Sequence, residues 1–297
     1  MKRAPDAISD PEAIMLHHRI SAVSILLVVS TAFASQVPSY DLPVDPSIPI
    51  ITLNYVGGLT ELPRQNINPV LTIRADGSVT ISDALGRTKD IETSIPGEEV
   101  QELLRFSLRE QSFLDFNTGD TLQAIAAQNA LCGRFMRVED GAATVIHIRT
   151  MDLDHEARFN SLGVFAETYP GVKPLRQLWT IERRLNDLVE ELKAGGKDAV
   201  ATAAEQATSF VKQQQNPVTF KVEDLQRTVM TPDGRRMLEF KHDSEDGTTL
   251  SVNVEYKSEQ PRQTSQGSQP PQPPSISGEI SRKLPAHPIM SCRTGND

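Results

Sequence analysis

Short stretches in which apolar and polar residues alternate recur along the chain, and Asp-Gly pairs separate several of them. Residues 50–56 are rich in β-branched side chains and predict a strand that ends at the Gly57-Gly58 pair. Further strands flank four Asp-Gly turns, which lie at 75–77, 139–141, 232–234 and 245–247. Antiparallel meanders are therefore the main sheet element that we expect.

The apolar positions also predict the register of three of these hairpins. At 75–77 a two-residue loop would set apolar residues opposite polar ones, whereas a three-residue loop with a left-handed Gly77 brings the apolar residues together. The same argument applies at 245–247, while the strands around 139–141 fix no register. The predicted cross-strand pairs are Ile73 with Val79, Leu71 with Ile81, Phe240 with Val252, Leu238 with Val254, and Val229 with Met237.

Apolar residues at helical spacing predict three helices between these meanders, and residues 122–130 are a further, shorter candidate. The first opens at Ser94 and Pro96 and runs to about residue 111, and a short Ala-rich helix covers 122–130. A long helix begins near Pro174 and is ended by glycines at 195–196, and a last one covers 198–215. The long helix carries a narrow apolar seam of Leu178, Ile181, Leu185, Leu188 and Leu192. The seam could form a coiled-coil dimer interface, but its short length favours packing on the sheet.

The first part of the chain has the order of a signal peptide. A basic segment at 17–19 precedes an apolar run over 20–29, and Ala32-Phe33-Ala34 offers the small side chains that signal peptidase requires. This predicts cleavage between Ala34 and Ser35. About ten apolar residues are too few for a membrane anchor, because spanning a bilayer takes about 20. We therefore expect an exported protein, in the periplasm, at the cell surface or outside the cell, with no stable membrane insertion after cleavage.

The predicted fold is α+β, with antiparallel meanders packed against two or three helices and a disordered tail. A stretch at 35–49 with four prolines predicts an extended leader. The tail is rich in Pro, Gln and Ser and has few residues that could form a core. The predicted parts are a signal peptide at 1–34, the leader at 35–49, a body of two meander-plus-helix units at 50–193, a linking helix at 194–217, a meander at 218–257 and the tail at 258–297.

Charge and cysteine content narrow the possible partners. The formal net charge is -9, and no stretch clusters basic with aromatic residues, so binding to nucleic acid is not expected. Cys132 and Cys292 are the two cysteines of the chain. Two cysteines are too few for a disulfide framework. A bridge between them would close a long loop, and whether they pair is left open.

The densest group of reactive side chains lies between residues 147 and 158. Carboxylates and imidazoles are usual ligands of divalent metal ions and can act as acid and base. The candidate metal ligands are His147, Asp152, Asp154, His155 and Glu156. The same alternation is typical of a solvated strand edge, with Arg149 and Arg158 as partners for the acids. Because no motif fixes the geometry of the group, the structural interpretation is preferred.

Known catalytic motifs are missing from the mature sequence. It contains no GxSxG, HExxH, P-loop or GxGxxG pattern. His242 faces Leu250 in the last predicted hairpin, and Cys132 is a lone thiol, so both are interpreted as structural residues. We assign no catalytic residue and no cofactor.

Three stretches resemble uncharacterised exported proteins of planctomycete-type bacteria. They are GGLTELPR at 57–64, the hairpin LTIRADGSVTI at 71–81 followed by EVQELLRF at 99–106, and DHEARFNSLG at 154–163. The resemblance spans about 50–190 and implies export and an α+β body. It implies no activity and no catalytic residues.

These features favour a non-catalytic protein that binds another protein or a cell-envelope component through a sheet face or edge. The first alternative is a metal-assisted hydrolase that uses the cluster from His147 to Glu156. The second is a secreted protease inhibitor, which rests on fold analogy alone. The sequence leaves the oligomeric state open.

Overall fold

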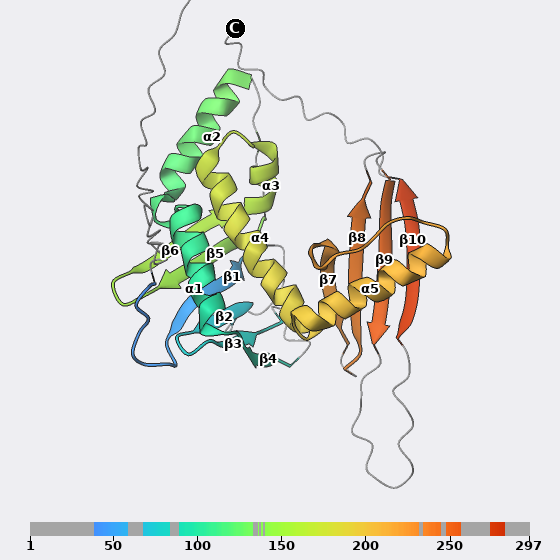
Figure 1. Ribbon diagram of the computed structural model, residues 1–297. Helices are drawn as coiled ribbons and strands as arrows, with labels where there is room; N and C mark the ends of the chain where they lie inside the picture. Colours follow the sequence, from blue (N-terminus) through green and yellow to red (C-terminus); the bar gives the residue numbers. More distant parts are fainter. Residues whose placement is uncertain are drawn as a thin grey trace, which may run out of the picture. The chain divides into compact units, whose positions relative to one another are not determined.

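The structure is a computed structural model of the 297-residue chain. It describes residues 39–58, 68–83, 89–132, 136, 138, 140–231, 234–244, 248–256 and 274–282. Two antiparallel sheets and five α-helices make up this described part, which confirms the predicted α+β class (Figure 1). The helices in these ranges include none that is long and apolar enough to cross a membrane. The predicted signal peptide over 1–34 lies outside the described residues.

The first sheet has six strands in the order β4-β3-β2-β1-β5-β6, and all neighbours are antiparallel. Its strands are β1 (Pro49–Val56), β2 (Leu71–Arg74), β3 (Ser78–Ile81), β4 (Ile91–Ser94), β5 (Ala143–Arg149) and β6 (Asp154–Asn160). Strand β5 pairs with β1 from Ile51 to Val56. The two predicted meander-plus-helix units therefore share one sheet and are not separate.

The hairpin of β2 and β3 has the predicted register. Ile73 lies opposite Val79, Leu71 lies opposite Ile81, and Gly77 has a φ of +82°. The Ile95 backbone N–H donates to the Gly77 carbonyl at 3.0 Å, so the turn lies against the start of the next helix. A Cβ at position 77 would lie only 2.5 Å from the Ile95 carbonyl oxygen. Both the backbone conformation and the close approach therefore require glycine.

The hairpin predicted at 139–141 is wrong. Met136 and Val138 are described and belong to no strand, although part of the predicted hairpin lies outside the described residues. Strand β5 has β1 on one edge and β6 on the other. Since a strand has two hydrogen-bonding edges, no edge of β5 is left for Met136 and Val138.

Helices α1 (Gly97–Arg105) and α4 (Lys173–Ala194) cover one face of the six-stranded sheet (Figure 1). Glu98 and Glu99 lie in the first turn of α1, where carboxylates favour the positive end of the helix. The remaining elements of this part are a π-helical turn η1 (Phe106–Glu110), a 3-10 turn η2 (Phe113–Asp115), α2 (Thr118–Cys132) and α3 (Leu162–Thr168). The three predicted helices and the Ala-rich candidate are all present, and α3 is additional.

The apolar seam of α4 packs in the core, as preferred from the sequence. Leu178, Ile181, Leu185 and Leu188 are each no more than 2% exposed. The seam is therefore not available as a coiled-coil dimer interface. Gly195, with a φ of +106°, ends the helix and accepts the left-handed conformation that this position requires.

The described part of the Pro-rich leader, from residue 39 on, is packed on the body and is not a free extended segment. Tyr40 and the side chain of Gln101 form a reciprocal pair of hydrogen bonds, at 2.7 and 2.9 Å. The Met151 N–H donates to the Asp41 carbonyl at 2.8 Å. Tyr40 and Leu42 pack against the core, and these apolar anchors were overlooked among the prolines. For residues 39–48, the prediction is thus corrected.

The second sheet has the order β10-β9-β8-β7, and α5 (Lys197–Gln213) covers one face of it (Figure 1). Its other elements are a 3-10 turn η3 (Val222–Asp224), β7 (Leu225–Met230), β8 (Arg236–Asp243), β9 (Thr248–Tyr256) and β10 (Ser275–Arg282). The predicted pairs of Phe240 with Val252, Leu238 with Val254 and Val229 with Met237 are all confirmed.

The prediction of a disordered tail is wrong for the residues of strand β10. Residues 258–297 were expected to be disordered, yet Ser275–Arg282 pairs antiparallel with β9 along its whole length. Ile276 packs against the core of this sheet, and Gly278 lies against Phe210 of α5. Backbone hydrogen bonds to an available sheet edge form this strand, and composition does not report them. The remaining residues of the predicted tail, apart from 274–282, lie outside the described ranges.

The end of α4 is bonded to the first strand of the second sheet. The Thr228 hydroxyl donates to the Glu190 carbonyl at 2.9 Å, and the Thr228 N–H donates to the Glu190 carboxylate. Lys193 Nζ bonds the other carboxylate oxygen of Glu190 at 2.9 Å. These contacts fix where β7 lies along α4.

Replacing Gly77 with Ala is expected to lower the free energy of unfolding by about 1–3 kcal/mol. The reason is the combination of a positive φ and a Cβ that would collide with the Ile95 carbonyl. Gly97→Ala is the matched control, because Gly97 has open space at its Cβ position and no positive φ. It should change stability by less than about 0.5 kcal/mol. Urea unfolding of both variants measures the difference, and equal stabilities would contradict this account of the turn.

Candidate functional site

The sequence-predicted cluster lies on β5, β6 and the turn between them. His147 on β5 stands opposite Glu156 on β6, and its Nε2 lies 2.5 Å from Oδ1 of Asp154. Arg149 Nε lies 3.5 Å from the other oxygen of Asp154. The hydrogen bond with His147 lowers the pKa of Asp154, and the nearby charges of His147 and Arg149 lower it further. This side of the cluster is a surface ion-pair group.

The other candidates lie elsewhere. Strand alternation places His155 on the opposite face of the sheet, where its ring meets the Phe113 ring edge-on at 5.3 Å. Asp152 lies in the exposed turn before β6. Within the described ranges, no group of three or more His, Cys, Asp or Glu side chains could hold a metal ion. The five predicted ligands are thus divided between two sheet faces and a turn and do not form one donor set.

An open cavity of about 420 Å³ lies beside the divided cluster, between the leader loop and the turn from β5 to β6. Val44 and Met151 line it and are 90% and 55% exposed. Arg149 and Asp154 also line it, but they already pair with each other. The cavity is therefore lined by an ion pair and by separate apolar side chains. Its reactive groups do not point toward a common centre.

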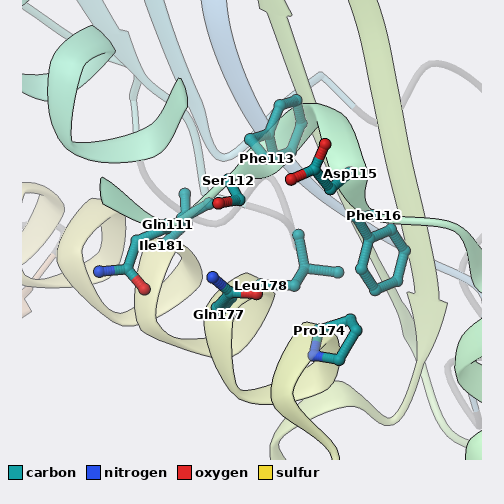
Figure 2. A pocket seen from close by; sticks show the side chains of 9 residues that line it. All are labelled: Gln111, Ser112, Phe113, Asp115, Phe116, Pro174, Gln177, Leu178 and Ile181. Carbon is teal, nitrogen blue, oxygen red and sulfur yellow. The ribbon is translucent and has the colours of Figure 1, made fainter. Parts of the chain in front are cut away.

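A second cavity lies where the turn after α1 meets α4 (Figure 2). Figure 2 shows Ser112 and Asp115 beside the rings of Phe113 and Phe116, with Leu178 of α4 across from them. Its volume is only about 20 Å³. A cavity holds one water molecule at roughly 10–15 Å³. This site accommodates a single water and is too small for a substrate.

The third cavity is an open groove of about 490 Å³ between α2, β6 and α3, which we name the α2 groove. Ligand sites usually occupy roughly 300–1,000 Å³, so its size suits a small molecule or a side-chain cluster. Its apolar lining residues are Leu122, Ile125, Ala126, Met136, Val138, Phe159 and Phe165. Its polar lining residues are Thr118, Asn129, Arg158 and Asn160.

The sequence of α2 explains one wall of the α2 groove. Leu122, Ile125, Ala126 and Asn129 follow the i, i+3, i+4, i+7 spacing and therefore share one helix face. The opposite face is not clearly polar, because Leu131 on it is 79% exposed and stands on the same side as Asp120. The helix lies beside β6 and is not packed flat on the sheet, because α1 and α4 already cover the apolar sheet face.

Aromatic residues form the floor of the α2 groove. The ring of Phe159 meets the rings of Phe116 and Phe165 edge-on, at centroid distances of 6.3 and 5.7 Å. Phe159 is only 3% exposed, whereas Leu122 on the wall is 49% exposed. The α2 groove thus combines a rigid buried floor with an apolar side chain that is still open to solvent.

Two of the polar residues that line the α2 groove, Thr118 and Asn129, are hydrogen-bonded within the protein. The Thr118 hydroxyl donates to the Arg158 carbonyl at 2.7 Å, and the Tyr169 hydroxyl donates to Asn129 Oδ1 at 2.7 Å. These two bonds also attach α2 to β6 and to the end of α3. Among the described residues that line the groove, Arg158 is the charged one, and it is exposed.

Sequence reasoning missed the α2 groove. It identified the Ala-rich helix but assigned no role to its apolar residues. The available signal was that the apolar and polar residues of α2 are not separated onto two opposite faces, as they are in a helix that packs on the core through one side. Phe159 and Phe165 could not be assigned to the groove, since the sequence does not show that β6 is an edge strand.

A buried polar cluster lies between α4 and the sheet. Thr144 donates to Glu182 Oε1 at 2.8 Å, and Asn186 donates to the hydroxyl of Tyr55 at 2.7 Å. Tyr55 lies directly opposite Thr144 across β1 and β5. Burial raises the pKa of Glu182, although the hydrogen bonds with Thr144 and Tyr55 oppose the shift. Burial and the charge of Glu182 also raise the pKa of Tyr55.

A buried carboxyl group with a raised pKa is a possible acid or base in catalysis. None of the three cavities above is lined by a member of this cluster. Glu182 is only 8% exposed, so a substrate would have no access to it. We therefore interpret the cluster as a structural link between the helix and the sheet.

Comparisons of the chain with family models, with curated proteins and with solved structures found no match. The resemblance to planctomycete-type exported proteins therefore stays a prediction.

Glu182→Gln is expected to change how stability depends on pH. Burial raises the folded-state pKa of Glu182 above its ordinary value of 4.5, so the folded protein binds more protons than the unfolded chain. The free energy of unfolding should therefore fall as the pH rises from about 4.5 through the raised pKa, and this decline should be absent in the Gln variant. Urea unfolding at a series of pH values measures both profiles.

The control for this experiment is Glu205→Gln on the exposed side of α5. It should keep the wild-type decline. If Glu182→Gln and the wild-type protein gave the same pH profile, burial of Glu182 would not carry the thermodynamic consequence assigned to it.

Proposed function

We propose that this chain is an exported, non-catalytic binding protein that holds an apolar part of its ligand in the α2 groove. The observation that supports this most directly is a preformed groove of about 490 Å³ with an aromatic floor and a half-exposed Leu122 on its wall. An apolar surface of this kind is stabilised when a ligand removes it from water.

The ligand belongs to a protein or to another component of the cell envelope. Export supports this assignment, and it rests on the basic, apolar and small-residue order of residues 17–34, with cleavage between Ala34 and Ser35. The resemblance to planctomycete-type exported proteins points to the same compartment. The location of the α2 groove beside β6 agrees with binding near a sheet edge.

The alternatives have less support. A metal-assisted hydrolase would need His147, Asp154 and His155 to converge, whereas His155 faces the core side of the sheet. No feature of the described residues favours a protease inhibitor over a general binding protein. Neither alternative is proposed further.

Leu122→Gln should weaken binding of an apolar probe, because it puts an amide on the wall of the α2 groove. The probe is the neutral dye Nile red, whose fluorescence rises in apolar surroundings. We expect the apparent affinity to fall about threefold to tenfold, as for loss of roughly 1 kcal/mol of apolar contact.

Leu131→Gln is the matched control, since Leu131 is exposed on the other side of the same helix and does not line the groove. It should leave dye binding unchanged. If the mature protein bound no dye, or if both variants bound it equally, the α2 groove would not be the binding site.

Substitution of Ala32 or Ala34 with Asp should block removal of the leader in a secreting bacterial host. Signal peptidase requires small side chains at these two positions and tolerates a larger one between them. Phe33→Ser is therefore the matched control and should be processed normally. Intact mass measures the outcome, and a wild-type secreted protein that does not begin at Ser35 would contradict the assignment.

A further inference from the structure

Strand β10 is an edge strand that contributes little to the core of its sheet (Figure 1). It pairs antiparallel with β9 along all of Ser275–Arg282 and is the last strand in the order β10-β9-β8-β7. Ile276 packs against the core, whereas residues 275 and 277–279 are exposed. The strand is therefore held mainly by its backbone pairing with β9.

The opposite edge of the same sheet is attached more firmly. The Thr228 hydroxyl on β7 donates to the Glu190 carbonyl of α4 at 2.9 Å, and Thr228 is only 4% exposed. On β10, the Ser275 hydroxyl donates to the Glu255 carboxylate of β9 at 3.2 Å, but this bond is exposed and solvent competes for it. We therefore expect β10 to be the strand of this sheet that separates from it most readily.

The connection between β9 and β10 is long and polar. Residues 257–274 separate the two strands, whereas residues 231–235 join β7 to β8 and residues 244–247 join β8 to β9. Apart from its prolines, the long connection contains no hydrophobic residue. Closing a longer loop costs more conformational entropy, so this connection holds β10 against β9 less tightly than a short turn would. β10 is thus covalently tethered, but it occupies its place in the manner of a bound peptide.

The place that β10 occupies requires a particular pattern of side chains. Its residues 276, 278 and 280 stand opposite three buried apolar residues of β9, which are Val254, Val252 and Leu250. Phe210 of α5 lies against the middle position, where a Cβ on Gly278 would come within 2.9 Å of the ring. The site therefore suits an extended segment in which glycine lies between two apolar residues at alternate positions.

We infer that the outer edge of β9, together with Phe210, binds an extended segment of a partner protein with the pattern apolar-x-Gly-x-apolar, and that β10 is a tethered competitor for this edge. In this mode of recognition, main-chain hydrogen bonds to the sheet edge supply affinity and the alternate side chains supply specificity. The chemistry of the partner segment follows from β10, which the structure shows in the same place. Phe210, Val252 and Val254 are not among the described residues that line the α2 groove, so the inference goes beyond the proposed function.

A labelled peptide tests the β9 edge in the full mature protein. The probe is fluorescein-labelled PSISGEISR, the sequence of residues 274–282, and fluorescence anisotropy measures its binding. Gly278→Val places a branched side chain against Phe210 and should displace β10. Ile276→Asp removes the apolar contact with the core and should act in the same direction. Either change should raise the apparent affinity for the probe at least about tenfold, because the site is then open in most molecules.

Ser277→Val is the matched control, because residue 277 is exposed and strand alternation turns it away from the face that Phe210 contacts. It should leave β10 in place and should not raise the affinity for the probe. A second probe, PSISVEISR, carries valine in place of the glycine. It should bind the Gly278→Val and Ile276→Asp proteins at least about tenfold more weakly than the first probe.

Hydrogen exchange shows directly whether β10 leaves its place. In the wild-type protein, the backbone amides of β10 should exchange at least about tenfold faster than those that join β8 to β9. Exchange of β10 only at the rate of global unfolding, or no release of β10 by either substitution, would overturn its role as a tethered competitor.

The binding data decide the remaining part of the inference. If both substitutions released β10 and neither raised the affinity for the probe, or if the two probes bound equally, the β9 edge would not be the binding site. Leu122→Gln in the α2 groove should leave binding of the peptide unchanged. Failure of the peptide test therefore leaves the proposed function standing, and failure of the dye test leaves this inference standing.

Discussion

Burial of the apolar face of the six-stranded sheet under α1 and α4 is the interaction on which the other features depend. The seam of α4, from Leu178 to Leu188, is removed from water by this packing and fixes the helix on the sheet. The helix runs on to Ala194, and its last turns provide Glu190 as an acceptor for Thr228 of β7. The same helix therefore covers the first sheet with its middle turns and is bonded to the second sheet through its last turns.

The same coverage explains why a groove exists. Because α1 and α4 occupy the sheet face, α2 lies beside β6 and is attached through Thr118 and Asn129. Its apolar face meets the aromatic floor only in part, and Leu122 is left half exposed. The groove between the helix and the floor thus exists because α1 and α4 already cover the sheet face. A ligand in the groove would bury apolar surface that the fold leaves exposed.

The polar residues of the protein fall into two classes with different consequences. His147 and Asp154 pair at the surface, where solvent screens their interaction and a change of partner has little effect on stability. Glu182 is bonded inside, where Thr144 and Tyr55 compensate for lost hydration. The residues that stand out in the sequence are therefore a surface pair, whereas the buried group joins Glu182 to Thr144, a residue far from it along the chain.

The sequence by itself determined the α+β class, the helices and the register of three hairpins, because these depend on the alternation of nearby residues and on turn glycines such as Gly77. Only the tertiary structure decided that β5 pairs with β1, that Ser275–Arg282 joins β9, and that the leader packs through Tyr40. Strand pairing between distant segments depends on backbone hydrogen bonds, which are the same for every residue type. The α2 groove and the division of the His147 to Glu156 cluster follow from those pairings. A local pattern shows which side chains share a face, but it does not show which distant face they meet.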